Sequence, residues 1–567
     1  MEVLKKSWPF LLGLIISASL LWPQFAAPSY PYHDDVTFIR LFEMDKCFKD
    51  GQIPCRWVPD LGNLYGYPLF NYYAPLPYYF GELIYFFTQN LIFSVKIMFV
   101  VSFIGSYIFM YLLARKFWGP MGGALSAIFY SLAPYHAVDF YVRGALGEMW
   151  GLMFFPAIFW AFTRLQENSN IRNMLLAGLF PALLATSHNL STFLFLLPTV
   201  IWIVVLYFKK RAKQFLFFSL GSIVIAFGLA SFYILPAIVE KDLVHVDSTT
   251  SGYFFYTEHF KGFKKLLGNY FGYGGSFREV PGGPTDGIPY QIGWVHLLGF
   301  LISIYTAWML WKKKRWFAIV LISSAVMVLV SAFMINPRSE FIWKTIEPLK
   351  YLQFPWRFLM LVIFFISFLA GSFSLLNFKY KNHLWAVLLA LVFAMNFSNF
   401  KPEFFTQDND KEILSGQNWE RRVNRAIFDF LPIYSKDPPG ELAAQRYQIL
   451  TGDTKISDFK EGTNWINFSA DTKTHSIIRL SQYYFPDWKI FVDGIDTKIE
   501  YKDNSLGLMT IILGEGNHKI EAKLFDTPVR SISNMITSLT AVLFLLLFVT
   551  SFKKVRGLIT YYRRRAY

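Results

Sequence analysis

The strongest constraint on this chain is the number of long apolar segments that it contains. A helix needs roughly 17 to 25 mostly apolar residues to cross the hydrocarbon of a bilayer. Stretches close to this length recur along the whole sequence, and 54% of the residues are hydrophobic while only 16% are charged. We therefore expect a polytopic α-helical membrane protein with about twelve spans. The predicted spans are 8–25, 92–113, 122–135, 148–162, 174–187, 190–208, 215–238, 292–311, 316–334, 358–376, 384–395 and 535–552.

Basic residues in the connections between these segments predict the topology. Lys and Arg near the ends of spans collect on the cytoplasmic side of a membrane, and here they fall in every second connection. We expect a multi-pass protein of the cytoplasmic membrane with both termini in the cytoplasm. The basic residues in these connections also explain the net charge of +15, which therefore does not indicate a nucleic-acid partner. The clusters are Lys5/Lys6, Arg115/Lys116, Arg164/Arg172, 209–213, 312–315, Lys379/Lys381 and 553–565.

The first apolar segment has a competing interpretation as a cleaved signal peptide. Lys5 and Lys6 precede an apolar core that ends at Ala26-Ala27, as in such peptides. Cleavage would remove one span and break the alternation of basic connections. The alternation thus favours a first membrane helix that remains in the protein.

Three segments on the predicted outer side are long, at 26–89, 239–291 and 399–530. The last has short alternations of apolar and polar residues separated by turns, which predict a β-sandwich. Within it, 488–492 is a predicted strand that leads into an Asp493-Gly494 hairpin turn, and Ile520, Ala522 and Leu524 share one face of another strand. We divide the chain into a membrane domain (1–398), an extracytoplasmic β-rich domain (399–530) and a last span with a basic tail (531–567).

The first outer segment holds the two cysteines of the chain and a dense run of aromatic residues. Cys47 and Cys55 would face an oxidising compartment, where they form either a disulfide or two free thiols. Tyr72 and Tyr73 belong to a tyrosine- and proline-rich run at 65–79. Such a run is typical of a shelf on which sugar rings stack, or of an ordinary aromatic belt at the membrane surface.

Several motifs resemble the YfhO-like and "6-pyruvoyl-tetrahydropterin synthase-related" bacterial membrane proteins, which belong to the GT-C class of glycosyltransferases. The resemblance covers nearly the whole chain and implies a GT-C-like fold. It also implies an inverting transfer of a sugar from a polyprenyl-phosphate donor to an extracytoplasmic glycan, lipid or protein acceptor. Despite the family's name, the sequence has no cluster of histidines at the spacing that a zinc site of a pterin synthase would need. The motifs are His33-Asp34-Asp35, the run from 56–62 to Pro75-Leu76, 352–358, and 507–530 with Asp526-Thr527-Pro528.

The resemblance implies that a carboxylate takes the proton of the acceptor hydroxyl. Asp34 or Asp35, next to His33, has this position just beyond the first span. Alternatively, the two acids bind a divalent cation, Mg²⁺ or Mn²⁺, or cap the helix that follows them.

Positive groups are expected to neutralise the departing lipid phosphate. Arginine suits this role because its planar fork of donors matches a phosphate. Two alternatives remain open, because an Arg143/Glu148 pair could merely tie a loop and His188 could be a hydrogen-bonded turn residue. The candidates are Arg143, Arg357, Arg56 and His188, supported by Glu148, Gln353 and Trp356.

Two other classes of protein compete with a transferase. A transporter or flippase would bury ionisable residues in the middle of its spans, and these spans are nearly free of them. A non-catalytic envelope-assembly protein would use the outer β-domain and would need neither aspartate. The glycine-rich 269–276 stretch lacks the flanking strand and helix of a nucleotide loop.

Overall fold

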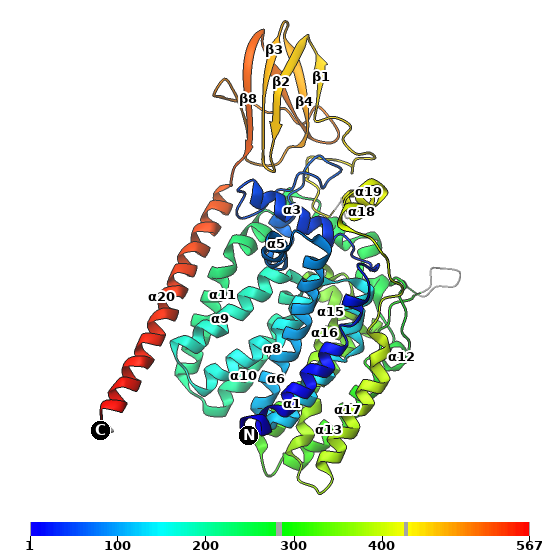
Figure 1. Cartoon of the computed structure of the whole chain (residues 1–567), viewed down its shortest axis with the longest axis vertical. Coiled ribbons are helices and arrows are strands. Elements are labelled where there is room, and N and C mark those ends of the chain that lie inside the picture. Colours follow the sequence, from blue (N-terminus) through cyan, green and yellow to red (C-terminus); the bar gives the residue numbers. More distant parts are fainter. Residues whose placement is uncertain (1, 279–285, 425–428, 566–567) are drawn as a thin grey trace.

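The computed structural model describes residues 2–278, 286–424 and 429–565. Figure 1 shows a bundle of helices with a β-domain at one end and both chain termini at the opposite end. This arrangement agrees with an even number of crossings between the two termini. The β-domain therefore identifies the predicted outer end of the bundle.

Helices occupy all twelve segments that the sequence analysis predicted as spans. By length and composition, seven helical segments in the described part of the chain could cross a membrane, and three shorter ones are also apolar. These segments, together with α17, form the bundle. The helices of the bundle are α1 (Glu2–Ser19), α6 (Leu91–Ser131), α8 (Leu146–Glu167), α9 (Ile171–Ser187), α10 (Asn189–Lys210), α11 (Lys213–Val239), α13 (Trp294–Leu310), α14 (Arg315–Ile335), α16 (Leu359–Ala370), α17 (Lys381–Asn396) and α20 (Pro528–Arg565).

Two predicted spans lie in α6, which folds back on itself. Gly119 at the turn has a φ of 74°, a conformation that glycine adopts without strain, and Pro120 follows it. A Cβ placed on Gly123 would lie 3.0 Å from the Cα of Arg115, so the two arms are in close contact. The α6 segment is thus a helical hairpin.

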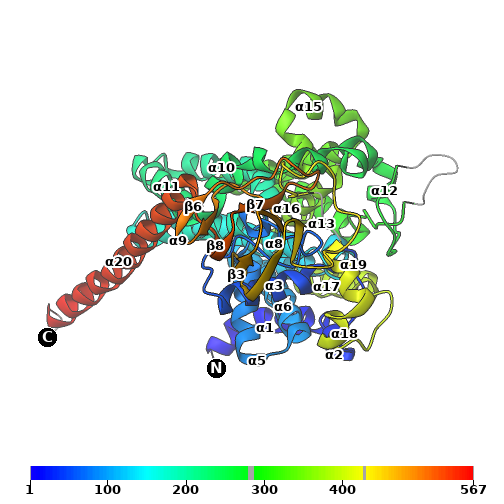
Figure 2. The same ribbon diagram turned by 90° about the horizontal axis from the view of Figure 1, so that it is seen from above.

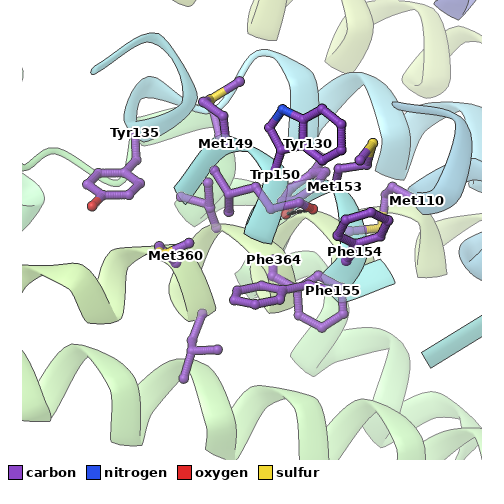
Figure 3. Close-up of a cluster of buried hydrophobic side chains, with 14 of the residues drawn as sticks. Met110, Tyr130, Tyr135, Met149, Trp150, Met153, Phe154, Phe155, Met360 and Phe364 are labelled. Atoms are coloured by element: carbon purple, nitrogen blue, oxygen red, sulfur yellow. Dashed lines mark hydrogen bonds between the residues drawn. The ribbon is translucent and has the colours of Figure 1, made fainter. Parts of the chain in front are cut away.

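The centre of the bundle is formed by α8 and by the segment that contains α16. In their apolar windows 94% and 89% of the residues are buried, against 6% for α20, which packs along α11. Figure 3 shows Met and aromatic side chains of α6, α8 and α16 in this centre, among them Trp150, Phe155 and Phe364. Because lipid tails are as apolar as these side chains, close packing rather than transfer from water holds the helices together.

Basic connections gather at the end of the bundle that lies away from the β-domain. Lys116, beside the α6 turn, lies 2.7 Å from the Glu167 carboxylate at the end of α8. Lys210, at the end of α10, donates to the backbone carbonyl of Glu167. Three of the connections predicted to be cytoplasmic therefore meet at one surface.

The first outer segment folds over the opposite end of the bundle. It contains α3 (Thr37–Lys49), α4 (Leu69–Tyr72) and α5 (Leu76–Thr88). Cys47 and Cys55 form a disulfide, which is one of the two alternatives that the sequence left open. The chain enters α3 without a side-chain cap. The side chains of Asp34 and Asp35 therefore do not cap this helix.

The β-domain is a sandwich of two antiparallel sheets that share one core. The predicted 488–492 strand, its Asp493-Gly494 turn and the buried face of Ile520, Ala522 and Leu524 are all present. The sheets have the orders β1-β4-β7 and β2-β3-β8-β5-β6. The strands are β1 (Tyr447–Thr451), β2 (Thr454–Glu461), β3 (Trp465–Thr472), β4 (Ser476–Tyr483), β5 (Trp488–Val492), β6 (Ile495–Thr497), β7 (Leu508–Leu513) and β8 (Gly516–Leu524).

The strands begin only at Tyr447, later than the expected domain boundary at 399. The described residues between them, which we call the strap (400–424 and 429–446), run over the outer ends of the helices. The strap contains α18 (Asp410–Ile413) and α19 (Gly416–Asn424). Its Asp410 carboxylate accepts hydrogen bonds from the first two backbone N–H groups of α6, which ties the strap to the membrane domain.

A buried polar network fixes the β-domain to the bundle. Arg530, at the start of α20, donates from Nε to Glu240 at the end of α11, over 2.9 Å. Glu240 also accepts from Thr527 and Asn71. Arg56, a predicted phosphate ligand, belongs to this network, where it contacts Asn71 and donates to a backbone carbonyl and to Asn534.

We expect Glu240→Gln to destabilise the protein, because Arg530 is 1% exposed and would lose its counter-charge. Breaking a buried pair costs about 3 to 5 kcal/mol, which a drop in Tm in detergent would report. Glu340→Gln is the matched control, since Glu340 and its partner Lys344 are exposed and such pairs contribute below about 1 kcal/mol. Equal Tm values for the two variants would contradict the assignment.

Candidate functional site

A cavity of about 400 Å³ opens at the outer end of the bundle, below the β-domain that Figure 2 shows from above. Its walls come from parts of the chain that are far apart in sequence. They are the first outer segment, the connection before α8, the α9–α10 turn, the end of α11, the segment before α16 and the strap. The polar lining residues are Asp34, Arg40, Tyr67, Tyr72, Tyr73, Arg143, Glu148, His188, Asn189, Lys241, Thr249, Tyr351, Gln353, Arg357, Arg422 and Asp429.

At the inner wall one carboxylate is held by two arginines. Both Nη atoms of Arg143 donate to the two Glu148 oxygens, over 2.7 and 2.8 Å. Arg357 donates from Nε to Glu148 over 2.9 Å and from Nη1 to the Gln353 side chain. Glu148 is 2% exposed, whereas the arginine side chains keep 11% and 9% exposure. The Arg143/Glu148 pair that the sequence suggested as a loop tie is therefore also part of the cavity wall.

A second carboxylate lies behind this pair. Asp139, in the π-helical turn Val138–Arg143, lies 2.5 Å from Arg143. Burial raises the pKa of Asp139, and the nearby Glu148 carboxylate adds to the shift. On the side of the cavity, two guanidinium groups surround the Glu148 carboxylate. Trp356 does not line the cavity, but its ring supports the Arg143 guanidinium at 4.6 Å.

His188 is both a turn residue and a lining residue. Its Nδ1 accepts from the Ser191 backbone N–H and thereby caps α10. Burial, together with the positive charges of Arg357 and Arg143, lowers the pKa of His188 to about 4. The ring is therefore neutral near pH 7, with Nε2 as its donor.

Asp34 lies at the cavity, and its backbone N–H donates to the carbonyl of Arg143 over 2.8 Å. This bond places the first outer segment directly beside the arginine wall. The Asp34 side chain is 39% exposed, and its carboxylate lies 3.5 Å from Nη1 of Arg40. The carboxylate is thus open to the cavity and close to a cation.

Asp35 does not line the cavity, and its carboxylate is directed away from that of Asp34. Its carboxylate lies 2.7 Å from Arg421 and 3.5 Å from Arg422, in the strap. His33 likewise leaves the cavity and contacts the carbonyl of Tyr273. Successive side chains here diverge, which separates the two carboxylates.

A divalent cation between Asp34 and Asp35 does not fit this arrangement, because each carboxylate faces arginines. In the described part of the chain, no three His, Cys, Asp or Glu side chains gather in a way that could hold a metal ion. We therefore derive no step through a metal.

The aromatic run of the first outer segment reaches the cavity through two tyrosines. Tyr72 stacks on Phe430 of the strap at 5.6 Å, and its hydroxyl donates to the Glu240 carbonyl. Tyr73 lies under the Arg40 guanidinium at 4.0 Å. Gln353 also lines the cavity, whereas Arg56 does not.

Four charged lining residues escaped the sequence analysis, namely Arg40, Lys241, Arg422 and Asp429. Arg40 lies six residues after Asp34, on the first turn of α3. Its short distance in sequence from the acidic pair, at the start of the helix that follows, could have indicated it. Asp429 lies in the strap, almost four hundred residues later, and no motif marks it. Only the fold brings it to the cavity.

The 6-pyruvoyl-tetrahydropterin synthase related domain, a membrane protein family, matches residues 70–403, and the chain belongs to this family. The matched range includes Arg143, Glu148, His188 and Arg357, but neither Asp34 nor Asp429. No curated protein matches the chain.

Two solved glycosyltransferases have limited similarity to the chain. One is arabinofuranosyltransferase AftD from Mycobacteria, with 14% identity and a TM-score of 0.44 over 70% of this chain and 27% of that one. The other is the Archaeoglobus fulgidus oligosaccharyltransferase tethered to an acceptor peptide, with 12% identity and a TM-score of 0.42 over 75% and 57%. The chain thus spans about a quarter of the first protein and somewhat over half of the second.

Substitutions of the two neighbouring acids should lower stability by different amounts. Asp35→Asn removes a nearly buried charge from Arg421 and Arg422 and should cost about 1 to 3 kcal/mol. Asp34→Asn affects a more exposed pair, and we expect less than about 1 kcal/mol. Thermal melts in detergent compare the two variants, and a larger loss for Asp34→Asn would refute the divided roles.

Proposed function

We propose that this member of the pterin synthase-related membrane family is a glycosyltransferase. It would move a sugar from a polyprenyl-phosphate donor to an acceptor on the outer side of the cytoplasmic membrane. The observation that carries the proposal is one cavity in which an accessible carboxylate, Asp34, lies beside the arginine wall of Arg143 and Arg357. These are the two charges that such a transfer needs.

The arginine wall is suited to the leaving phosphate. As the bond between the anomeric carbon and the phosphate oxygen breaks, its electron pair moves to that oxygen and negative charge develops there. Arg143 and Arg357 are fixed by Glu148 before any ligand arrives, so they need little rearrangement to stabilise this charge. A neutral His188 can add a hydrogen bond from Nε2.

Asp34 is the residue that we assign to the acceptor. Its carboxylate takes the proton of the acceptor hydroxyl while that oxygen forms the new bond to the anomeric carbon. Attack from the side opposite the phosphate would invert the configuration at that carbon. Tyr72 and Tyr73 supply aromatic wall to the same cavity and suit an apolar sugar face.

The assay measures transfer of radiolabelled sugar from a panel of decaprenyl-phosphate sugars by the purified protein in liposomes. We expect Asp34→Asn to lower the rate at least about 100-fold, the usual contribution of a general base. Asp35→Asn is the matched control and should retain transfer, because its carboxylate faces Arg421. Equal rates for Asp34→Asn and the unsubstituted protein would remove the catalytic assignment.

Binding of decaprenyl phosphate without a sugar tests the phosphate wall separately. Arg357→Gln should weaken binding by about tenfold or more, since a charge-assisted bond contributes about 1.5 to 3 kcal/mol. Arg421→Gln, which removes a half-exposed arginine outside the cavity, should leave binding unchanged. Microscale thermophoresis in detergent gives both affinities. Equal affinity for Arg357→Gln and the unsubstituted protein would exclude the wall as the phosphate site.

The same two assays separate the rival classes of protein. A flippase would bind decaprenyl phosphate without transferring sugar, and a structural assembly protein would do neither. Either result would replace the proposed transferase.

A further inference from the structure

The glycine-rich run at 269–276 has no part in the proposed transfer, yet it contacts both sides of the site. The backbone carbonyl of Tyr273 lies 2.9 Å from Nε2 of His33, the residue before Asp34. The Ser276 hydroxyl accepts a hydrogen bond from the indole Nε1 of Trp356, over 3.0 Å. Trp356 directly precedes Arg357. One short run thus touches the neighbours of two proposed site residues.

Glycines in this run allow a close contact between two stretches of backbone. A Cβ placed on Gly274 would lie 2.8 Å from the Cα of Gly287, and one placed on Gly287 would lie 2.6 Å from the Cα of Gly274. Gly287 also donates its backbone N–H to the Gly275 carbonyl over 2.9 Å. Backbones this close leave no room for side chains. The contact sets the position of the chain immediately before Ser276.

The Ser276 hydroxyl is the middle member of a chain of three hydrogen bonds. It is fully buried, and its Oγ lies 2.9 Å from Nδ1 of His259. Nε2 of His259 contacts the carbonyl of Tyr253, which can only accept, so the ring proton is on Nε2. Burial lowers the pKa of His259 to about 4, so the ring is neutral near pH 7. Ser276 therefore donates to Nδ1 of His259 and accepts from Trp356.

Trp356 and Phe354 form a stacked pair of rings that supports the arginine wall. Their centroids are 4.9 Å apart and their planes differ by 20°. The guanidinium carbon of Arg143 lies 4.6 Å from the Trp356 ring, and that of Arg357 lies 4.8 Å from the Phe354 ring. The His259 ring meets Phe354 edge-on at 4.5 Å. Since aromatic faces attract guanidinium groups, each arginine of the wall rests on one ring of the pair.

The bond to Ser276 fixes the orientation of the Trp356 ring. Stacking on Phe354 sets the plane of the indole but allows it to turn within that plane, whereas the directional Nε1 bond opposes this rotation. Trp356 is 1% exposed, so loss of the acceptor would leave an unpaired N–H in the protein interior. Arg143 is thus held at its edge by Glu148 and at its face by an oriented ring.

We propose that Ser276 is a positioning residue for the arginine wall, which it orients through Trp356, and that the glycine-rich run is therefore part of the phosphate site. This inference rests on the proposed function, because it takes the wall as the place where the lipid phosphate binds. Without the Ser276 hydroxyl, the indole can turn and Arg143 loses its oriented support.

The first experiment measures affinity for decaprenyl phosphate by microscale thermophoresis in detergent. Ser276→Ala should weaken binding about threefold to tenfold, which corresponds to the loss of one hydrogen bond. Ser533→Ala is the matched control, because Ser533 is equally buried but donates to the Arg530 carbonyl at the start of α20. Its affinity should equal that of the unsubstituted protein. Unchanged affinity for Ser276→Ala would overturn the inference.

A double-mutant cycle tests whether Ser276 acts through the indole. Trp356→Phe keeps an aromatic ring between Phe354 and Arg143 but has no N–H to donate, so it should also weaken binding. Ser276→Ala should have no further effect in the Trp356→Phe background, because both changes remove the same bond. Additive effects would overturn the inference. If Ser276→Ala does not fold, unchanged affinity for Trp356→Phe alone would overturn it as well.

Nuclear magnetic resonance of isotopically labelled tryptophan gives a readout that needs no ligand. The indole N–H signal that disappears in Trp356→Phe belongs to Trp356. Ser276→Ala should shift that signal, because its N–H loses the acceptor, and an unshifted signal would overturn the inference. Absence of decaprenyl-phosphate binding by the unsubstituted protein would overturn the proposed function and this inference with it. Binding that does not respond to Ser276→Ala would overturn the inference alone.

Discussion

The structure depends most on the contact in which Arg143 and Arg357 hold Glu148. A lone charge at the mouth of an apolar bundle would be costly, and each of these residues is acceptable there because the others are present. The contact joins the beginning of α8 to a segment more than two hundred residues later. It therefore fixes the relative positions of the two most buried spans and forms a wall in which two guanidinium groups surround the Glu148 carboxylate.

The remaining parts of the cavity are arranged around this wall. The backbone of Asp34 is bonded to the carbonyl of Arg143, so the first outer segment is aligned with the arginines rather than merely close to them. The strap then lies over both and contributes Phe430 to the same surface. A site assembled in this way requires the helices, the first outer segment and the strap to fold together.

The sequence predicted those features that depend on local pattern. Long apolar runs mark spans wherever they occur, and the Asp493-Gly494 turn follows from the backbone freedom that such a turn requires. The cavity depends instead on which segments meet. Asp34 and Asp35 are indistinguishable in sequence, yet only Asp34 faces the cavity. Arg56 was predicted to bind phosphate because it is an arginine, but it belongs to the network that joins the β-domain to the bundle. Asp429 could not be predicted, because nothing in the sequence of the strap indicates that it lies at the cavity.

The β-domain is attached through its two chain connections and along the first outer segment. The strap enters it and α20 leaves it, with Arg530 bonded to Glu240. The Asp50 carboxylate of the first outer segment accepts from Thr463 and Trp465. A domain attached in this way cannot swing freely on a single hinge. Displacement of the domain would be transmitted to the strap and the first outer segment, which both line the cavity. The β-domain is thus mechanically coupled to the cavity beneath it.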